Sequence, residues 1–379
     1  MLRDHTRRNA HAPGYELPVN RAGRKTGGRF ALTLSIGAFG GSLMWLAHMP
    51  LAWLLGAMLA TAVCAFAGLP VSLPKQARPP MTAVIGAMLG TSFSPDTFAH
   101  AAAWSISLVG LVAFIALTGA LAFVYFRWIA RLDPVTAFFS AMPGGLVEMI
   151  TLGAEKGGDE RMIALIHSAR IFLVVLTLPF LIQTFAGITI DRTGIFSAGE
   201  MAISAEDVIW FGSAVVGGVA LGTLLKLPAR FLVGPMLASA ILHLVGVTDF
   251  ELPVAALACA QVVIGATIGC RFANASPRLI LRALALAAGA TVLMLLSTVM
   301  FAWLLSLAGG DRFVAYVLAY SPGGVAEMSL IALSLHVEVP FVVLHHVVRV
   351  LTVVAGASLA FRLLKERCGE FVQRPCSGS

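Results

Sequence analysis

The chain has 379 residues, of which 58% are apolar and only 12% are charged, and its net charge is +7. A soluble domain carries about 25% charged residues, so the composition excludes an ordinary soluble protein and indicates a polytopic membrane protein. The five cysteines are scattered and odd in number, which implies neither a disulfide framework nor a zinc site.

A basic stretch at 1–29 opens the chain. It lacks the interleaved aromatic residues of a DNA-binding module, and tails of this kind more often set membrane orientation. We therefore expect a cytoplasmic tail and no direct binding of nucleic acid.

Twelve apolar segments follow, and a membrane span needs about 20 residues. They lie at 30–48, 51–69, 81–98, 102–126, 134–154, 162–187, 208–226, 230–247, 253–270, 283–308, 313–335 and 340–363. The predicted domains are the tail at 1–29, membrane repeat 1 at 30–190, an acidic external connector at 191–207, membrane repeat 2 at 208–364 and a cytoplasmic tail at 365–379.

The positions of lysine and arginine decide between two topologies. If every segment crosses once, Arg271, Arg278 and Arg282 lie outside and the acidic connector lies inside, against the positive-inside rule. If the fifth segment of each half enters and leaves on the same side, these residues, Arg78 and both termini are cytoplasmic. This predicts about ten transmembrane helices plus two re-entrant or broken segments, in two inverted-topology repeats typical of secondary transporters.

One motif occurs twice and shows that the chain is an internal duplication. Ala141–Met149 reads AMPGGLVEM, and Tyr320–Met328 reads YSPGGVAEM. An offset of 179 residues (322 minus 143) aligns the two prolines and also the His-x-x-Arg that follows each motif. Each half therefore carries the same set of unusual residues.

Pro-Gly-Gly inside an apolar segment breaks a helix, and irregular backbone at membrane depth persists only beside protein or a watery cavity. The helix that restarts would direct free N–H groups at that cavity, which suits an anion. A proline kink that serves packing is the alternative. The candidate substrate-binding residues are Pro143, Gly144, Gly145, Pro322, Gly323 and Gly324.

Glu148 and Glu327 lie five residues after the prolines in apolar surroundings. A charge there costs several kcal/mol, so each must be paired, protonated or hydrated. One role is proton or cation coupling. An ion pair with Arg170 or Arg349 of the same half is the structural alternative, and the two roles are compatible.

Arg170 and Arg349 lie well inside predicted spans and are candidates for binding the anion, because a guanidinium makes forked contacts with oxyanions. Snorkelling to the interface is the alternative. His167 and His346 lie three residues earlier on the same helix face and are candidates for proton relay. A hydrogen-bonded core histidine is the alternative for each.

Two pairs of glycines, Gly86 with Gly90 and Gly265 with Gly269, also match across the duplication. Small residues four positions apart are typical of close helix packing in membranes. We expect a packing role for them.

The duplicated pattern at Met142–Met149 and Ser321–Met328 resembles the bacterial AbrB-type membrane protein family, over about Ala31 to Leu364. This resemblance brings two functional labels, ammonia monooxygenase and regulator of gene expression. Oxidation chemistry at copper needs clustered ligands, and the adjacent His345 and His346 diverge by about 100° on a helix. The residues therefore do not support the monooxygenase label. No helix-turn-helix fits the apolar sequence, so a regulatory role would be indirect.

The sequence thus predicts an all-α inner-membrane carrier for a small anionic solute, coupled to protons or another cation. The alternative is a membrane-embedded regulator that acts indirectly on gene expression. We expect no enzymatic activity, cofactor or metal. The expected partners are the solute and the lipid bilayer, with a homo-oligomer as the alternative to a monomer.

Overall fold

The computed structural model describes residues 21–95, 104–187, 204–250, 254–273, 275–309 and 312–367. These residues form helices and no strand: α1 (Arg21–Leu46), α2 (Ala52–Phe66), η1 (Lys75–Ala77), α3 (Arg78–Gly90), α5 (Trp104–Val124), η3 (Tyr125–Ile129), α6 (Pro134–Ala141), α7 (Leu146–Glu155), α8 (Glu160–Ala186), α10 (Ala205–Leu224), α11 (Arg230–Leu244), α12 (Val254–Gly269), η4 (Cys270–Phe272), α13 (Pro277–Gly309), α14 (Phe313–Tyr320), α15 (Val325–Ser334) and α16 (Val339–Arg367). Residues 1–20, 191–203 and 368–379 of the predicted tails and connector lie outside this part of the chain. The all-α prediction is confirmed.

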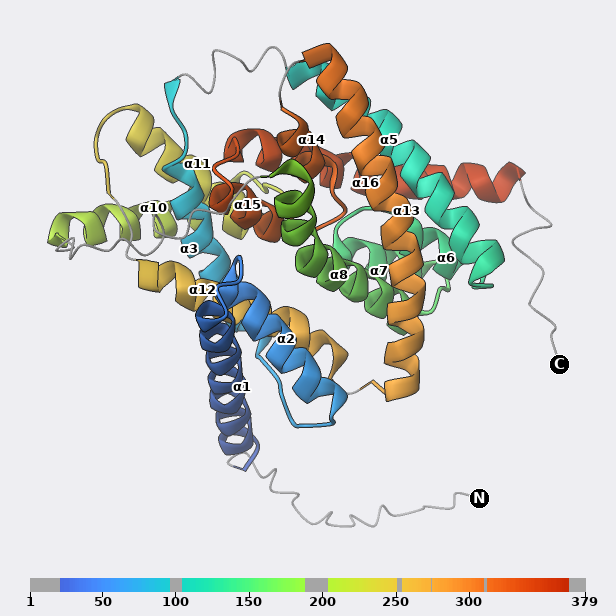
Figure 1. The fold of residues 1–379 in the computed structure, drawn as a ribbon, viewed down its shortest axis with the longest axis horizontal. Coiled ribbons are helices and arrows are strands. Elements are labelled where there is room, and N and C mark those ends of the chain that lie inside the picture. The colour runs from blue at the N-terminus through green and yellow to red at the C-terminus, as the bar shows by residue number, and fades with distance from the viewer. Residues whose placement is uncertain are drawn as a thin grey trace, which may run out of the picture.

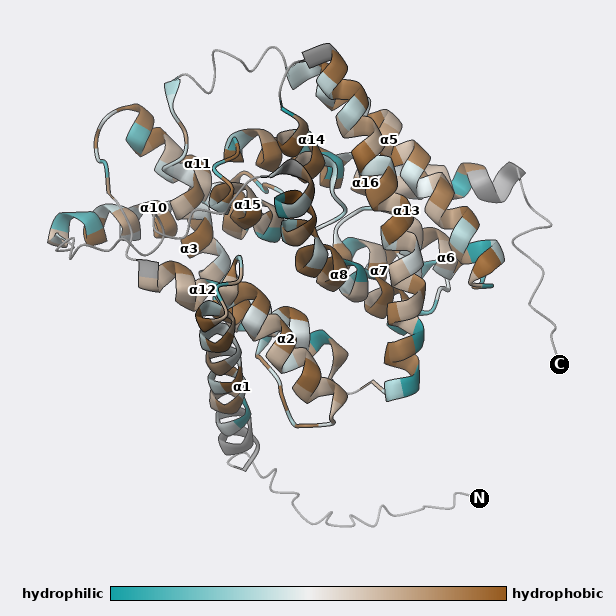
Figure 2. Cartoon of the chain, viewed as in Figure 1, coloured by the Kyte–Doolittle hydropathy of each residue, from teal (hydrophilic) through white to brown (hydrophobic). Residues whose placement is uncertain are grey.

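Ten helices correspond to the predicted spans other than the Pro-Gly-Gly segments. Within the described residues, seven helical stretches are long and apolar enough to cross a membrane, and apolar residues dominate most helices (Figure 2). The other three, α2, α3 and α11, have only 13 to 15 residues. The chain is therefore a polytopic helical membrane protein, and in the described part of the chain three of the ten expected spans are short helices.

The turn between the first two helices is the same in both halves. His48 and Leu51 have φ of 59° and 46°, and Lys226 and Ala229, their counterparts, have φ of 53° and 48°. Left-handed backbone is uncommon for residues other than glycine. The duplication therefore extends to unusual backbone conformations as well as to residue types.

The two repeats interlock through their glycine pairs. α3 of the first repeat packs against α11 of the second, and α12 of the second packs against α2 of the first. A β-carbon at each glycine would collide with a backbone carbonyl across the interface: Gly86 with Leu232, Gly90 with Met236, Gly265 with Leu54 and Gly269 with Met58. The predicted packing role is confirmed, because only glycine permits this approach.

Each Pro-Gly-Gly segment is a re-entrant hairpin. In hairpin 1 (α6, the break at 142–145, and α7), the backbone N–H of Asp159 donates to Thr136 Oγ1 at 2.8 Å, which joins the two ends. In hairpin 2 (α14, the break at 321–324, and α15), Arg312 and Glu338 form an ion pair at 3.3 Å between the residues that flank its two ends. Both segments therefore turn back toward the side from which they enter, as predicted.

The two repeats run in opposite directions. α5 and α13 are equivalent helices that pack against each other. In Figure 1, α5 runs from the top of the view downward, whereas α13 runs from the bottom upward. Antiparallel equivalent helices are what inverted-topology repeats require.

Candidate functional site

The second glycine of each motif makes room for the glutamate. A β-carbon at Gly145 would overlap Glu148 Oε2, and a β-carbon at Gly324 would overlap Glu327 Oε2. Gly145 and Gly324 are the N-caps of α7 and α15, and the glutamates lie in the first turns. A carboxylate in this position complements the positive end of the helix dipole, so each helix start already faces an acidic side chain of its own.

The first glycine of each motif accommodates the methionine that ends it. A β-carbon at Gly144 would meet Met149 and one at Gly323 would meet Met328, within 3.3 Å and 2.6 Å of their Cε atoms. None of the four motif glycines has a positive φ. Their role is to permit close approach of side chains to the backbone.

The histidines bind the carbonyl groups that the helix breaks leave free. Nε2 of His167 lies 2.8 Å from the carbonyl of Phe139, and Nε2 of His346 lies 3.0 Å from the carbonyl of Leu318. Both imidazoles are fully buried, and their Nε2–H groups donate. They satisfy carbonyls near the ends of α6 and α14, which otherwise lack partners.

Arg170 and Arg349 hold the breaks in the same way. Arg170 donates to the carbonyl of Met142 at 3.3 Å and to Nδ1 of His167 at 3.0 Å. Arg349 donates to the carbonyls of Ser321 and, at 2.7 Å, Gly323. Each guanidinium is also attracted by the negative end of the helix that the break terminates.

These bonds leave the Nε–H of each arginine free. Nε of Arg170 and Nε of Arg349 are buried and have no hydrogen-bond partner in the described chain. The two guanidinium groups lie near enough to interact electrostatically. The two breaks therefore meet inside the molecule, and both keep unused donor capacity.

The two glutamates have different surroundings. Glu327 is 1% exposed and pairs with Arg78 at 2.8 Å, while Glu148 is exposed and makes no ion pair with a described residue. The position equivalent to Arg78 in the second repeat is Leu257. The alternative prediction of a pair with Arg170 or Arg349 is wrong, because the partner of Glu327 comes from α3 of the other repeat.

Hairpin 2 is also more closely packed and more buried than hairpin 1. α15 packs against α3, whereas α7 makes no comparable contact with the equivalent helix α12. Most residues of α15 are buried, but only Met149 and Gly153 are buried in α7. Hairpin 1 is therefore the more open of the two.

Arg78 and Arg271 are site residues that sequence reasoning missed. Both were expected only to lie on the cytoplasmic side, but Arg78 begins α3 and pairs with Glu327. Arg271 interacts electrostatically with Arg78 and Glu327, and its Nη1 is buried without a partner in the described chain. The one sign in the sequence of their role was that both arginines lie next to the ends of short apolar segments.

A polar network joins the second break to Ser107 of the first repeat, whereas Ala141 and Ile166 occupy the positions equivalent to Tyr320 and His345 at the first break. The Tyr320 hydroxyl donates to the carbonyl of Ser107, and Ser107 Oγ lies 2.9 Å from Nε2 of His345. All three residues are buried. Across the described residues no three potential metal ligands lie together.

The fold and the site define a helical membrane protein built from two inverted repeats whose re-entrant hairpins meet among buried arginines. The chain belongs to the family described as "Transition state regulatory protein AbrB", whose model matches residues 53–365. This agrees with the resemblance carried by the doubled motif.

Two curated relatives match over most of the chain. The Bacillus subtilis (strain 168) protein named "Uncharacterized protein YhjN" is 32% identical over 282 residues, which cover 69% of this chain and 72% of the relative. The Escherichia coli (strain K12) protein named "Putative regulator AbrB" is 26% identical over 326 residues, which cover 83% of this chain and 90% of the relative.

Proposed function

We propose that the protein is a bacterial inner-membrane carrier of a small anion, coupled to protons or another cation, with both termini in the cytoplasm. The proposal rests on inverted repeats with re-entrant segments that meet inside the protein, an architecture shared by many secondary transporters.

One observation carries the choice of an anion. The buried Arg170 and Arg349 interact with each other. The half-buried Arg78 and Arg271 interact with each other and with Glu327, which is the one buried carboxylate among the described residues. Buried cations in a membrane are costly unless they are paired. A small oxyanion or carboxylate would supply the missing negative charge and accept bonds from forked guanidinium groups.

The bonds at the site divide the residues by role. His167, His346, Arg170 and Arg349 hold the breaks in shape, and Arg170 and Arg349 present their Nε groups to the solute. Arg271 also has a free donor and interacts electrostatically with Arg78 and Glu327. Glu148 is the accessible carboxylate, so we assign coupling to it first and to Glu327 only when its pair with Arg78 opens.

Binding of anions to the purified protein tests this function. Melting temperatures would be measured with chloride, phosphate, sulfate, acetate, succinate and citrate at two pH values, followed by uptake of any stabilising anion into proteoliposomes. We expect Arg271→Gln to reduce the affinity for the stabilising anion about tenfold, which is the effect of losing one charged hydrogen bond.

Arg278→Gln is the matched control, because Arg278 is exposed at the start of α13. It should leave anion binding unchanged. Equal weakening in both variants would show that general surface charge, and not this cluster, attracts the anion. An anion that binds but does not cross the bilayer would contradict a carrier.

The printed name of the E. coli relative supports a second candidate, a membrane regulator acting indirectly. In that case the basic tail at 1–29 would contact a cytoplasmic partner. Deletion of residues 1–20 distinguishes the two functions, because a carrier keeps transport and a tail-dependent regulator loses its effect.

A further inference from the structure

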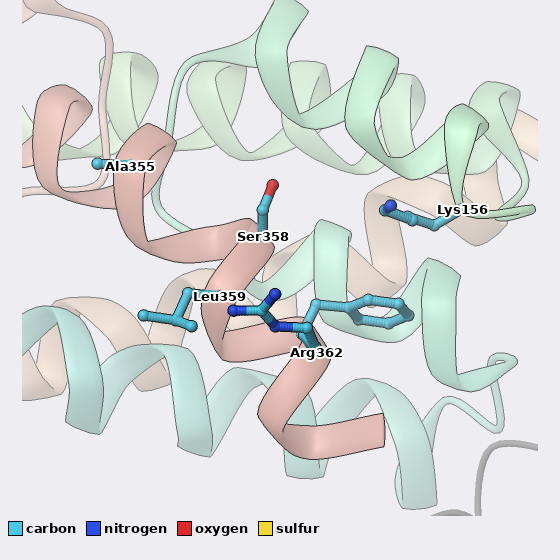
Figure 3. A pocket seen from close by; sticks show the side chains of 6 residues that line it. Lys156, Ala355, Ser358, Leu359 and Arg362 are labelled. Carbon is cyan, nitrogen blue, oxygen red and sulfur yellow. The ribbon is translucent and has the colours of Figure 1, made fainter. Parts of the chain in front are cut away.

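A basic pocket lies away from the two breaks, between the end of α7 and the C-terminal part of α16. Its volume is about 530 Å³, and its lining is Lys156, Ala355, Ser358, Leu359, Phe361 and Arg362. Figure 3 shows Lys156 on one wall and Ser358 and Arg362 on α16 opposite. The volume falls within the range of about 300–1,000 Å³ of small-molecule sites.

The two cations in this pocket have no acidic partner. Neither Lys156 nor Arg362 forms an ion pair with a described residue, and both side chains are exposed. The end of α7 does not need the lysine side chain, because the Lys156 backbone N–H already bonds to the carbonyls of Leu152 and Gly153. Two cations and a serine hydroxyl suit a phosphate group.

An apolar surface leads along α16 to this basic pocket. Leu351, Leu359 and Leu363 are 50%, 49% and 47% exposed, and Val354 is 36% exposed. Leu359 also lines the pocket. A ligand with an anionic head and hydrocarbon chains matches both features, and basic pockets between membrane helices bind anionic lipid headgroups.

We propose that this pocket binds the phosphate headgroup of an anionic phospholipid, with its acyl chains along α16. Lys156 closes hairpin 1 and Arg362 lies on α16, so the headgroup joins these two elements. Val353 of α16 also faces Gly144, which lies in the break of hairpin 1. The bound lipid would therefore brace the hairpin that is the more open in this structure.

Titration of the detergent-solubilised full-length protein with phosphatidylglycerol, followed by melting temperature, tests the site. We expect stabilisation of the wild type and, in Lys156→Gln/Arg362→Gln, a half-saturating concentration about 30-fold higher, as for the loss of two cations at a lipid headgroup. Arg278→Gln/Arg282→Gln removes the same charge from exposed positions on α13 and should titrate like the wild type.

A wild-type titration in Lys156→Gln/Arg362→Gln would overturn the proposal, as would equal stabilisation by zwitterionic phosphatidylethanolamine. Equal stabilisation by inorganic phosphate at the same concentrations would overturn a lipid source in favour of a free phosphate compound. If the double variant melts early without lipid, the charge-preserving Lys156→Arg/Arg362→Lys variant decides. If phosphatidylglycerol stabilises this variant as it does the wild type, the site is supported. If the lipid does not stabilise this variant, the proposal is overturned.

Discussion

Arg78 and Glu327 form an ion pair of 2.8 Å between the two repeats, although 249 positions separate them along the chain. The carboxylate is almost completely buried, and the arginine side chain is 32% exposed. The other repeat has Leu257 where this arginine would be. A chain built from two equivalent halves thus has one neutralised glutamate and one accessible glutamate.

Arg78→Gln should destabilise the protein more than Glu327→Gln does. The first substitution leaves the buried carboxylate without its ion-pair partner, which costs about 3 kcal/mol. The second substitution removes the buried negative charge itself and should cost about 1 kcal/mol. The free energy of unfolding of both variants and of the double variant, measured in detergent, gives the coupling between the two side chains.

Glu148→Gln is the control for this pair, because Glu148 occupies the same motif position and is exposed. It should change stability by less than about 0.5 kcal/mol. If Arg78→Gln and Glu148→Gln lower the free energy of unfolding by the same amount, the ion pair does not stabilise the structure.

Gly324→Ala should be more harmful than Gly145→Ala. A β-carbon at either position overlaps the glutamate carboxylate, but Glu148 is exposed and can rotate away, whereas Glu327 is enclosed and paired. We expect a loss of about 2–3 kcal/mol for Gly324→Ala and about 1 kcal/mol or less for Gly145→Ala, measured as free energy of unfolding.

Gly217→Ala provides the comparison, since a β-carbon at this position in α10 would meet no atom within 4 Å. It should be neutral or slightly stabilising, because alanine favours helix. If Gly145→Ala and Gly324→Ala lower the free energy of unfolding equally, the enclosure of hairpin 2 does not determine how much the added β-carbon destabilises the protein.

Arg349→Lys should destabilise the second break even though it preserves the charge. The guanidinium donates to the carbonyls of both Ser321 and Gly323, and a single ammonium group lacks that fork. We expect a loss of about 2 kcal/mol, that of one charged hydrogen bond. Unfolding in detergent measures it, with the exposed Arg230→Lys as control; similar losses in both would argue against a role at the break.

The bases of the two hairpins should lie on opposite sides of the membrane. Lys156 and His336 are exposed residues at the ends of hairpin 1 and hairpin 2. In a variant without native cysteines, a membrane-impermeant maleimide should label His336→Cys in intact spheroplasts and Lys156→Cys only in inverted vesicles. Labelling of both from one side would contradict the inverted topology.

Sequence alone determined the internal duplication, the two helix breaks and the inverted arrangement of the repeats. These features depend on local chemistry. The Pro-Gly-Gly sequence interrupts a helix, whereas the single Pro179 and Pro235 lie inside continuous helices, and the lysine and arginine positions indicate on which side each segment ends. The Pro-Gly-Gly segments at 143–145 and 322–324 could therefore be predicted as re-entrant without any knowledge of packing.

Only the tertiary structure decided what the polar residues contact. Helices that are apolar on all sides carry little information about which face meets which neighbour, so the pairing of Arg78 with Glu327 across the repeats could not be predicted. For the same reason Arg271 resembled a loop cation, and Arg170 and Arg349 showed no sign of holding the carbonyls of the breaks. Matched motifs are equivalent along the chain, but Glu148 and Glu327 differ because the other repeat places an arginine beside only one of them.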